Sequence, residues 1–195
     1  MEIRSGSPSD AEAIGRLIAS FQRELTDDPS GAGAEAYLAS VSAQAEREYL
    51  TSPRYRYLLA YADPQLAGFI AIRDGSHLFH LFIERAHQRQ GLARALWERA
   101  LHELGPPESQ GAFTVNSSLA AVPVYRALGF LPAGSIRSVH GISFLPMRRP
   151  GSTSVRPNPS LPERPGSWVR AGDSATQLSL SGTCLAGRSC TFFAM

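Results

Sequence analysis

The sequence predicts an α/β fold of the α+β kind, with a mixed, mostly antiparallel central sheet and helices on both faces. Segments with a helical period near 3.6 alternate with short strand-like runs, and three of these runs follow one another at tight turns. A helix separates the last of the three from the next strand-like run. With 195 residues and 43% hydrophobic content, the chain can bury one core.

The N-terminal part is predicted to contain a strand and two helices. Residues 2–6 form the strand, and residues 7–25 form a helix that has Pro8 and Asp10 near its start and apolar residues on one face, namely Ile14, Leu17, Ile18 and Phe21. Residues 33–50 form the second helix, which ends before Pro53.

Three strands are predicted next, over residues 54–63, 65–74 and 76–84. The connections around Asp63-Pro64 and Asp74-Gly75 are short and have residues typical of tight turns. These strands should therefore form an antiparallel meander.

The remaining elements are a helix over 91–104, a strand over 111–118, a helix over 119–130 that closes at Gly129, and a strand pair over 130–138 and 140–147. The strands 76–84 and 111–118 are joined by a helix, so they should lie parallel while the others pair antiparallel.

The composition places a domain boundary near Arg149. Residues 1–149 carry the periodic segments, whereas residues 150–195 are rich in Pro, Gly and Ser and read as a disordered tail. Both cysteines, Cys184 and Cys190, lie in this tail. We therefore expect the folded part to contain no disulfide and no metal site built from thiolates, and we expect no metal.

The charge and the hydropathy of the sequence argue against two classes of partner, nucleic acids and membranes. The basic residues are all arginine, and residues 1–149 hold 15 of them against 15 acidic residues, so the predicted domain is formally neutral. A nucleic-acid-binding role is not expected without a basic face. No apolar run approaches the ~20 residues of a membrane span, and the start lacks a signal-peptide layout. A cytoplasmic protein without membrane contact is expected.

The segment Gln88–Ala93, QRQGLA, joins a strand-like run to a helix. Gly91 has no side chain and Ala93 has only a methyl group, so an anion can approach the free N–H groups of the first helical turn. The longer stretch 83–93, IERAHQRQGLA, resembles the acetyl-CoA signature of the GNAT (GCN5-related N-acetyltransferase) family, with Gln88, Gly91 and Ala93 at its named positions.

A second stretch, VNSSLAAVPVYRALGF over 115–130, resembles the following strand and helix of the same family, with its tyrosine and terminal Gly-Phe. The sequence departs from the family at Arg85, where many relatives have Pro, at Arg89, where many have Gly, and at Ser118, where relatives often have Asn. With the order of elements, the resemblance extends over residues 1–149 and implies a GNAT-like acyl-CoA N-acyltransferase fold.

The resemblance implies that acetyl-CoA is the co-substrate. Its diphosphate would bind at the turn and first helical residues, which are Gln88, Arg89, Gln90, Gly91, Leu92 and Ala93. Its acetyl-pantetheine arm would bond to the backbone of Leu81, Phe82 and Ile83. Either Asn116 or Ser118 would contact the cofactor as well, and Ser118 is also suited to cap the helix that follows it.

The resemblance also suggests the catalytic groups. Tyr125 matches the family tyrosine that protonates the departing thiolate. For the base, His77 occupies the position six residues before Ile83 that some relatives use. His80 is an alternative that strict two-residue alternation puts on the opposite face unless a bulge intervenes. Glu84 and a chain of waters are the other options.

The predicted function is acetyl transfer to a primary amine of a small molecule or peptide by direct attack in a ternary complex. The predicted domain contains no cysteine, so a covalent cysteine intermediate is not expected. The alternatives are a non-catalytic acyl-CoA-binding regulatory or partner-binding module and a different nucleotide-phosphate binder. A cationic acceptor could be attracted by acidic residues, namely Glu24, Asp27, Asp28 or Glu48, and a homodimer is possible.

Overall fold

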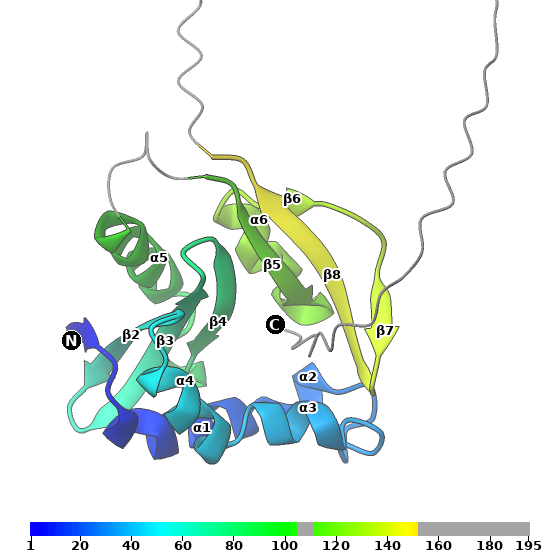
Figure 1. Cartoon of the computed structure of the whole chain (residues 1–195), viewed down its shortest axis with the longest axis horizontal. Coiled ribbons are helices and arrows are strands. Elements are labelled where there is room, and N and C mark those ends of the chain that lie inside the picture. Colours follow the sequence, from blue (N-terminus) through cyan, green and yellow to red (C-terminus); the bar gives the residue numbers. More distant parts are fainter. Residues whose placement is uncertain (105–110, 152–195) are drawn as a thin grey trace, which may run out of the picture. The chain divides into compact units, whose positions relative to one another are not determined.

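The computed structural model describes residues 1–104 and 111–151 (Figure 1). The strands are β1 (Glu2–Ser5), β2 (Tyr55–Ala62), β3 (Gln65–Arg73), β4 (His77–Ile83), β5 (Phe113–Ser118), β6 (Leu131–Pro132), β7 (Arg137–Val139) and β8 (Ile142–Arg149). The α-helices are α1 (Ala11–Ala19), α2 (Gln22–Leu25), α3 (Glu35–Ser40), α4 (Ala43–Thr51), α5 (Leu92–Glu103) and α6 (Val122–Ala127). Short 3₁₀ helices span Pro8–Asp10, Arg85–His87 and Leu119–Ala121.

The strands form one mixed sheet in the order β1-β2-β3-β4-β5-β8-β6, and β7 also pairs with β8. The pair β4–β5 is parallel, and the remaining pairs are antiparallel. The predicted meander and the predicted parallel pair are therefore both confirmed.

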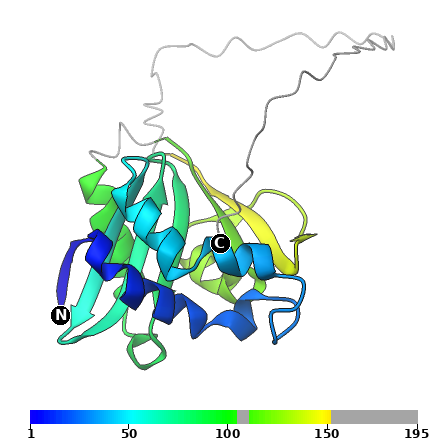
Figure 2. The same ribbon diagram turned by 60° about the horizontal axis from the view of Figure 1, so that its bottom comes forward.

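Each face of the sheet has its own apolar core, and helices cover both faces (Figures 1 and 2). The first core contains side chains from α1 and α3 packed on inward residues of β2–β4, among them Ile14, Ile18, Tyr37, Phe69 and Phe79. The second core joins α5 and α6 to the opposite face, with Leu96, Trp97, Tyr125, Ile70 and Leu78 among its members. Helices on both faces are thus confirmed.

The strands β4 and β5 pair only at their starts, where His77 lies opposite Thr114. The Thr114 amide donates to the Ser76 carbonyl at 3.0 Å, and beyond this point the described strands have no further register pairs with each other. Figure 1 shows the two strands diverging from there. The β5-facing edge of β4 is consequently left open along Leu81–Ile83.

A β-bulge interrupts β4. Its register with β3 pairs Ala71 with His80 but Ile72 with Leu78, which leaves Phe79 as the extra residue. Phe79 and His80 therefore both face the core under α1 and α4. The strict alternation that put His80 on the other face does not apply, because the bulge intervenes.

The two predicted N-terminal helices are each broken, so their predicted continuity is wrong. The first is interrupted at Ser20–Phe21, where the Ser20 hydroxyl donates to the Leu17 carbonyl at 2.7 Å and the chain tightens. The second is interrupted before Ser42, whose side chain accepts a hydrogen bond from the Ala45 amide and caps α4. In both cases a serine hydroxyl bonds to backbone groups at the helix boundary.

The C-terminal strand pair also differs from the prediction. The expected strand over 130–138 is two short strands, β6 and β7, which pair with different parts of β8. Pro132 ends β6 because proline has no N–H to continue a ladder, and the Ala133 amide donates instead to the Pro146 carbonyl at 2.8 Å. The predicted tail lies outside the described residues from position 152 onward.

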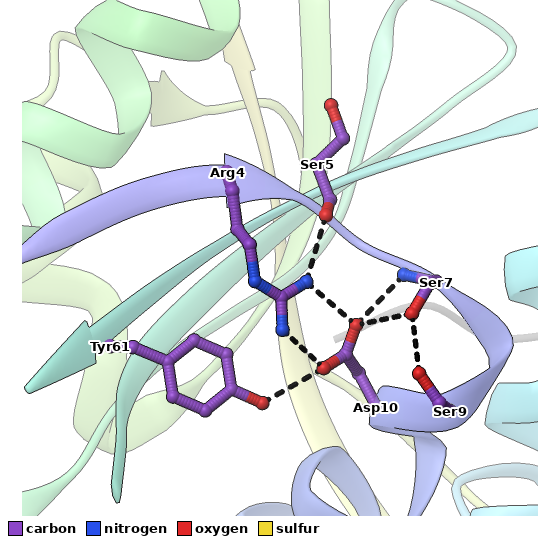
Figure 3. A network of polar contacts seen from close by, with 6 residues as sticks. All are labelled: Arg4, Ser5, Ser7, Ser9, Asp10 and Tyr61. Atoms are coloured by element: carbon purple, nitrogen blue, oxygen red, sulfur yellow. Dashed lines mark hydrogen bonds and ion pairs between the residues drawn. The ribbon is translucent and has the colours of Figure 1, made fainter. Parts of the chain in front are cut away.

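An ion pair between the partly exposed Arg4 and the buried carboxylate of Asp10 fixes the start of the chain to the sheet (Figure 3). Arg4 donates to both carboxylate oxygens of Asp10, at 2.9 and 2.7 Å. The Ser7 amide and the Tyr61 hydroxyl also donate to Asp10, each at 2.9 Å. The Arg4 guanidinium, followed by the Ser7 and Tyr61 donors, holds the pKa of Asp10 well below its usual range.

The variant Asp10→Asn is expected to lower the free energy of unfolding at pH 7 by about 1–3 kcal/mol, since buried donors lose a charged acceptor. A depressed pKa stabilises the fold above the unfolded-state value near ~4, and this contribution is lost progressively as the pH falls below it. Urea unfolding from pH 7 to pH 3 should therefore show the wild type converging on the variant at low pH.

The exposed pair Arg54–Asp74 provides the control for this prediction. It has the same two-point geometry, at 2.8 and 2.7 Å, but the side chains are 64% and 47% exposed. The variant Asp74→Asn should change stability by less than about 1 kcal/mol at any pH. Equal effects of the two substitutions would contradict the role given to burial.

Candidate active site

A groove of about 990 Å³ opens where β4 and β5 diverge. It is lined by the end of β4, by the turn and first residues of α5, and by residues of the segment from Ser118 to Leu128. Phe21, Glu24 and Leu25 line it from the N-terminal helices. The groove thus connects a helix N-terminus, an open strand edge and α6.

The start of α5 presents free backbone donors to this groove. Gly91 is the N-cap, with φ of 84°, and a Cβ added to it would meet nothing within 4 Å. The Ala95 amide donates to the Gly91 carbonyl at 3.0 Å, so the amides of Leu92, Ala93 and Arg94 precede the first intrahelical bond. The Gly91 amide has no acceptor within the described part of the chain. These donors, with the helix dipole, suit an anionic group.

The structure separates the polar residues of the predicted turn. Gln88 and Arg89 line the groove, but Gln88 Nε2 donates to the Ile83 carbonyl at 3.0 Å, so one of its amide hydrogens is committed to β4. Gln90 does not line the groove, and its Nε2 donates to the Ala86 carbonyl at 2.9 Å. Gln90 therefore supports the turn by its side chain.

The strand residues Leu81, Phe82 and Ile83 all line the groove, as expected. One backbone edge of this segment pairs with β3, with Ile70 opposite Leu81 and Gly68 opposite Ile83. The other edge faces the space left by the divergence of β5. An extended molecule can bond to that edge in the way that an added strand does.

Tyr125 lies on α6, lines the groove and is 3% exposed. Burial raises the pKa of its hydroxyl above the ordinary value near 10. The hydroxyl therefore keeps its proton at neutral pH, and it makes no hydrogen bond to the described residues. A protonated hydroxyl in this position can donate to a group in the groove.

Of the two residues left open as cofactor contacts, only Ser118 lines the groove. Asn116 lies within β5, opposite Pro146 of β8, and is half-buried. Ser118 precedes the 3₁₀ helix Leu119–Ala121, but its side chain makes no capping hydrogen bond. The expected capping role is therefore wrong.

The structure does not bring His77 to the groove. Its Nδ1 lies 2.7 Å from the Thr114 hydroxyl at the closed end of the strand pair. Burial, and then the positive charge of Arg73, lower the pKa of His77 to about 4. Glu84, another candidate base, accepts a hydrogen bond from the Ala86 amide at 2.8 Å and caps a 3₁₀ turn.

Arg85 departs from the family pattern and was not predicted as a site residue, although it lines the groove. Arg85 donates to the Ser20 carbonyl at 3.0 Å, forms an ion pair with Glu24 and lies 4.4 Å from the ring centre of Phe21. Arg94 also lines the groove. Arg85 and Glu24 are 61 residues apart in the sequence, so their pairing depends on the fold and cannot be predicted from local patterns.

Residues 1–104 and 111–151 contain no group of three His, Cys, Asp or Glu side chains that could hold a metal ion. None of their helices has both the length and the apolar character needed to cross a membrane.

Similar proteins were found by sequence. The [ribosomal protein bS18]-alanine N-acetyltransferase of Salmonella typhimurium (strain LT2) is 34% identical over 85 residues, which are 40% of this chain and 55% of that protein. The match thus spans about half the length of this curated relative.

Solved structures share the fold. A GCN5-related N-acetyltransferase from Rhodopseudomonas palustris superposes with a TM-score of 0.63 at 20% identity, over 76% of this chain and 94% of that one. The PaiA N-acetyltransferase of Thermoplasma acidophilum, solved in complex with coenzyme A, gives 0.56 at 17% identity, over 76% and 98%. The ribosomal-protein-S18-alanine N-acetyltransferase of Escherichia coli gives 0.56 at 21% identity, over 80% and 97%.

The sequence also matches a family model described as the acetyltransferase (GNAT) domain, from residue 25 to residue 150. This match covers more than half of the chain and includes the elements that form the groove. The chain therefore belongs to the GNAT acetyltransferase family.

Proposed function

We propose that this chain transfers an acetyl group from acetyl-CoA to a primary amine by direct attack within a ternary complex. The observation that carries the proposal is one continuous groove that joins the free amides of α5, the open edge of β4 and the buried hydroxyl of Tyr125. Bound acetyl-CoA would supply a thioester whose carbonyl carbon accepts the amine and whose sulfur leaves.

The residues of the groove fit this donor. The free amides of Gly91, Leu92, Ala93 and Arg94 can hold the diphosphate, and the absence of a side chain at Gly91 leaves room for its oxygens. Arg89 and Arg94 add positive charge on the groove wall. The open edge of Leu81–Ile83 can bond to the amides of the pantetheine arm.

Tyr125 would act as the general acid. A thiol has a pKa near ~8.5 and a phenol near ~10, so donation to a departing thiolate requires a positioned hydroxyl. The burial of Tyr125 keeps the proton on the hydroxyl, so that it is available to donate when the thiolate forms beside it. His77, Asn116 and Gln90, which do not line the groove, are not given a direct role.

The acceptor is proposed to be the amine of a peptide or small molecule. Support for a peptide comes from two relatives, whose names state that they act on the alanine of a ribosomal protein. Glu24, at the acceptor side, is already paired with Arg85 and so adds little free negative charge. A cytoplasmic location and a homodimer stay predictions.

The test is an assay of free thiol during incubation of the whole chain with acetyl-CoA and pools of primary amines and peptides. Amine-dependent thiol release is expected, together with a mass increase of one acetyl group on an amine. Thermal protection by acetyl-CoA without thiol release from any pool would contradict the proposal and favour a binding module.

A further inference from the structure

Glu46 is a carboxylate buried between α4 and the sheet, with no exposed surface. The Tyr57 hydroxyl donates to its Oε2 at 2.8 Å, and His80 Nε2 lies 3.0 Å from its Oε1. Tyr57 is 5% exposed and His80 is 1% exposed. Burial of a carboxylate is costly, so it requires donors of this kind.

The other ring nitrogen of His80 is left without a partner. A carboxylate only accepts hydrogen bonds, so Nε2 carries the hydrogen, and Nδ1 of the neutral ring is an unprotonated acceptor. Nδ1 is buried and has no hydrogen-bond partner among the described residues. An unpaired buried polar group costs about 1–3 kcal/mol, which a purely structural histidine would avoid.

A second unpaired polar atom lies nearby, on α3. The Tyr37 hydroxyl is buried and has no hydrogen-bond partner among the described residues. Burial raises the pKa of Tyr37, and the negative charge of Glu46 raises it further. The Tyr37 hydroxyl therefore keeps its proton at neutral pH.

His80 is also next to the groove. It immediately precedes Leu81, and its ring centre is 5.8 Å from that of Phe82, whose residue lines the groove. His80 and Phe82 are two residues apart in β4, so their side chains lie on the same side of the sheet. His80 thus lies directly beside the groove-lining segment Leu81–Ile83, with Glu46 at hydrogen-bond distance from its ring.

Acceptance of a proton by this cluster is electrostatically sound. A proton on Nδ1 would make the ring cationic while Nε2 still donates to Glu46. The new positive charge would then be paired with a carboxylate as soon as it forms. Among the described residues, no arginine side chain contacts Glu46, so no arginine competes with a protonated His80 for this carboxylate.

We propose that His80, held by Glu46, takes the proton that the acceptor ammonium must lose before it can attack. This rests on the acetyl transfer proposed above. The N–H bond of the ammonium breaks and its electron pair stays on nitrogen. The proton passes to Nδ1 through a water bound by the Tyr37 hydroxyl, since that hydroxyl and Nδ1 have no direct hydrogen bond to each other. The proton then returns to solvent. His80 acts through an intervening group and is a positioning residue for proton transfer.

The test is the pH profile of kcat and kcat/KM for wild type, His80→Gln and Glu46→Gln, with the best amine found in the thiol assay. At neutral pH, His80→Gln should lower kcat about a hundredfold with unchanged acetyl-CoA affinity. The deficit should shrink as the pH approaches ~10, where an alkyl amine loses its proton unaided. Glu46→Gln should alter the pH profile in the same range, from neutral pH to about pH 10.

The titratable groups around His80 are Glu46 on α4, Tyr57 on β2, Tyr37 on α3 and His77 on β4. His102→Gln, on the exposed face of α5, is the control for a change of histidine to glutamine and should keep the wild-type profile. Tyr37→Phe removes only an unpaired hydroxyl, so it should fold as well as wild type and lower kcat about tenfold at neutral pH, with the same recovery at high pH.

A parallel loss at all pH values in folded His80→Gln would overturn the inference, and so would an unchanged profile. If His77→Gln shifts this part of the pH profile and His80→Gln does not, the proton acceptor is His77. If His80→Gln does not fold, an unchanged profile in Tyr37→Phe overturns the relay. None of these results affects the proposed function, which fails only if the wild type releases no thiol with any amine.

Discussion

Gly91→Glu is expected to abolish acetyl-CoA binding, with Kd rising at least about a hundredfold. The substitution places a carboxylate in the open space above the Gly91 Cα, where the diphosphate would contact the free amides of α5. Charge-assisted hydrogen bonds are worth about 1.5–3 kcal/mol each, so the loss of one or two accounts for a change of this size. Titration calorimetry with acetyl-CoA measures the effect directly.

Gly75→Glu is the matched control for this substitution. Gly75 also has a positive φ, of 69°, and a Cβ added there would also meet nothing within 4 Å, but it lies in the β3–β4 turn and does not line the groove. Both variants share the strain of a side chain in a left-handed conformation and the same new charge. Wild-type affinity in Gly91→Glu would disprove the phosphate site, while equal losses in both variants would point to a general effect on folding.

Tyr125→Phe is expected to lower kcat by about 10²–10³-fold and to leave the Kd for acetyl-CoA within about twofold. The hydroxyl would be required only when the thiolate departs, whereas the ring packs against Phe130 at a centroid distance of 5.8 Å and stays in place. Pre-steady-state thiol release with saturating acetyl-CoA and amine separates the chemical step from product release.

Tyr55→Phe is the control for loss of a tyrosine hydroxyl. Tyr55 is half-buried on β2, and its ring packs against Tyr49 and Phe79 outside the groove. This variant should keep the wild-type kcat. A Tyr125→Phe enzyme with unchanged kcat would remove the general acid from the mechanism.

Local sequence patterns were sufficient for the parts of the site that depend on neighbours in the chain. The absence of a side chain at Gly91 is visible in QRQGLA, whereas its positive φ is seen only in the structure. The role predicted for Tyr125 came from its resemblance to the family tyrosine in a helix that closes at Gly129. The meander follows from tight turns between strands of similar length.

The parts that sequence patterns missed depend on contacts between distant residues. The Glu46–His80 hydrogen bond joins residues 34 apart, and the bulge before His80 puts Phe79 on the same side of the sheet as His80. Counting back from Ile83 gave His77 as a base, but the divergence of β4 and β5 leaves that residue at the closed end. The role of Gln90 depends on the shape of its turn, since the same amide can reach a ligand or the Ala86 carbonyl.

The bulge at Phe79 divides β4 into two parts, and the alternation of side chains between the two faces of the sheet is inverted from one part to the other. In an uninterrupted strand that kept Leu81–Ile83 in place, His80 would still lie on the face of Phe82, but Phe79 would lie among the hydrocarbon side chains beneath α5. Because of this one extra residue, the consecutive side chains of Phe79 and His80 lie on the same face of the sheet. Deletion of one residue at this point would turn the side chains of the preceding β4 residues to the opposite face of the sheet. The number of residues in β4 therefore decides which side chains lie beside His80.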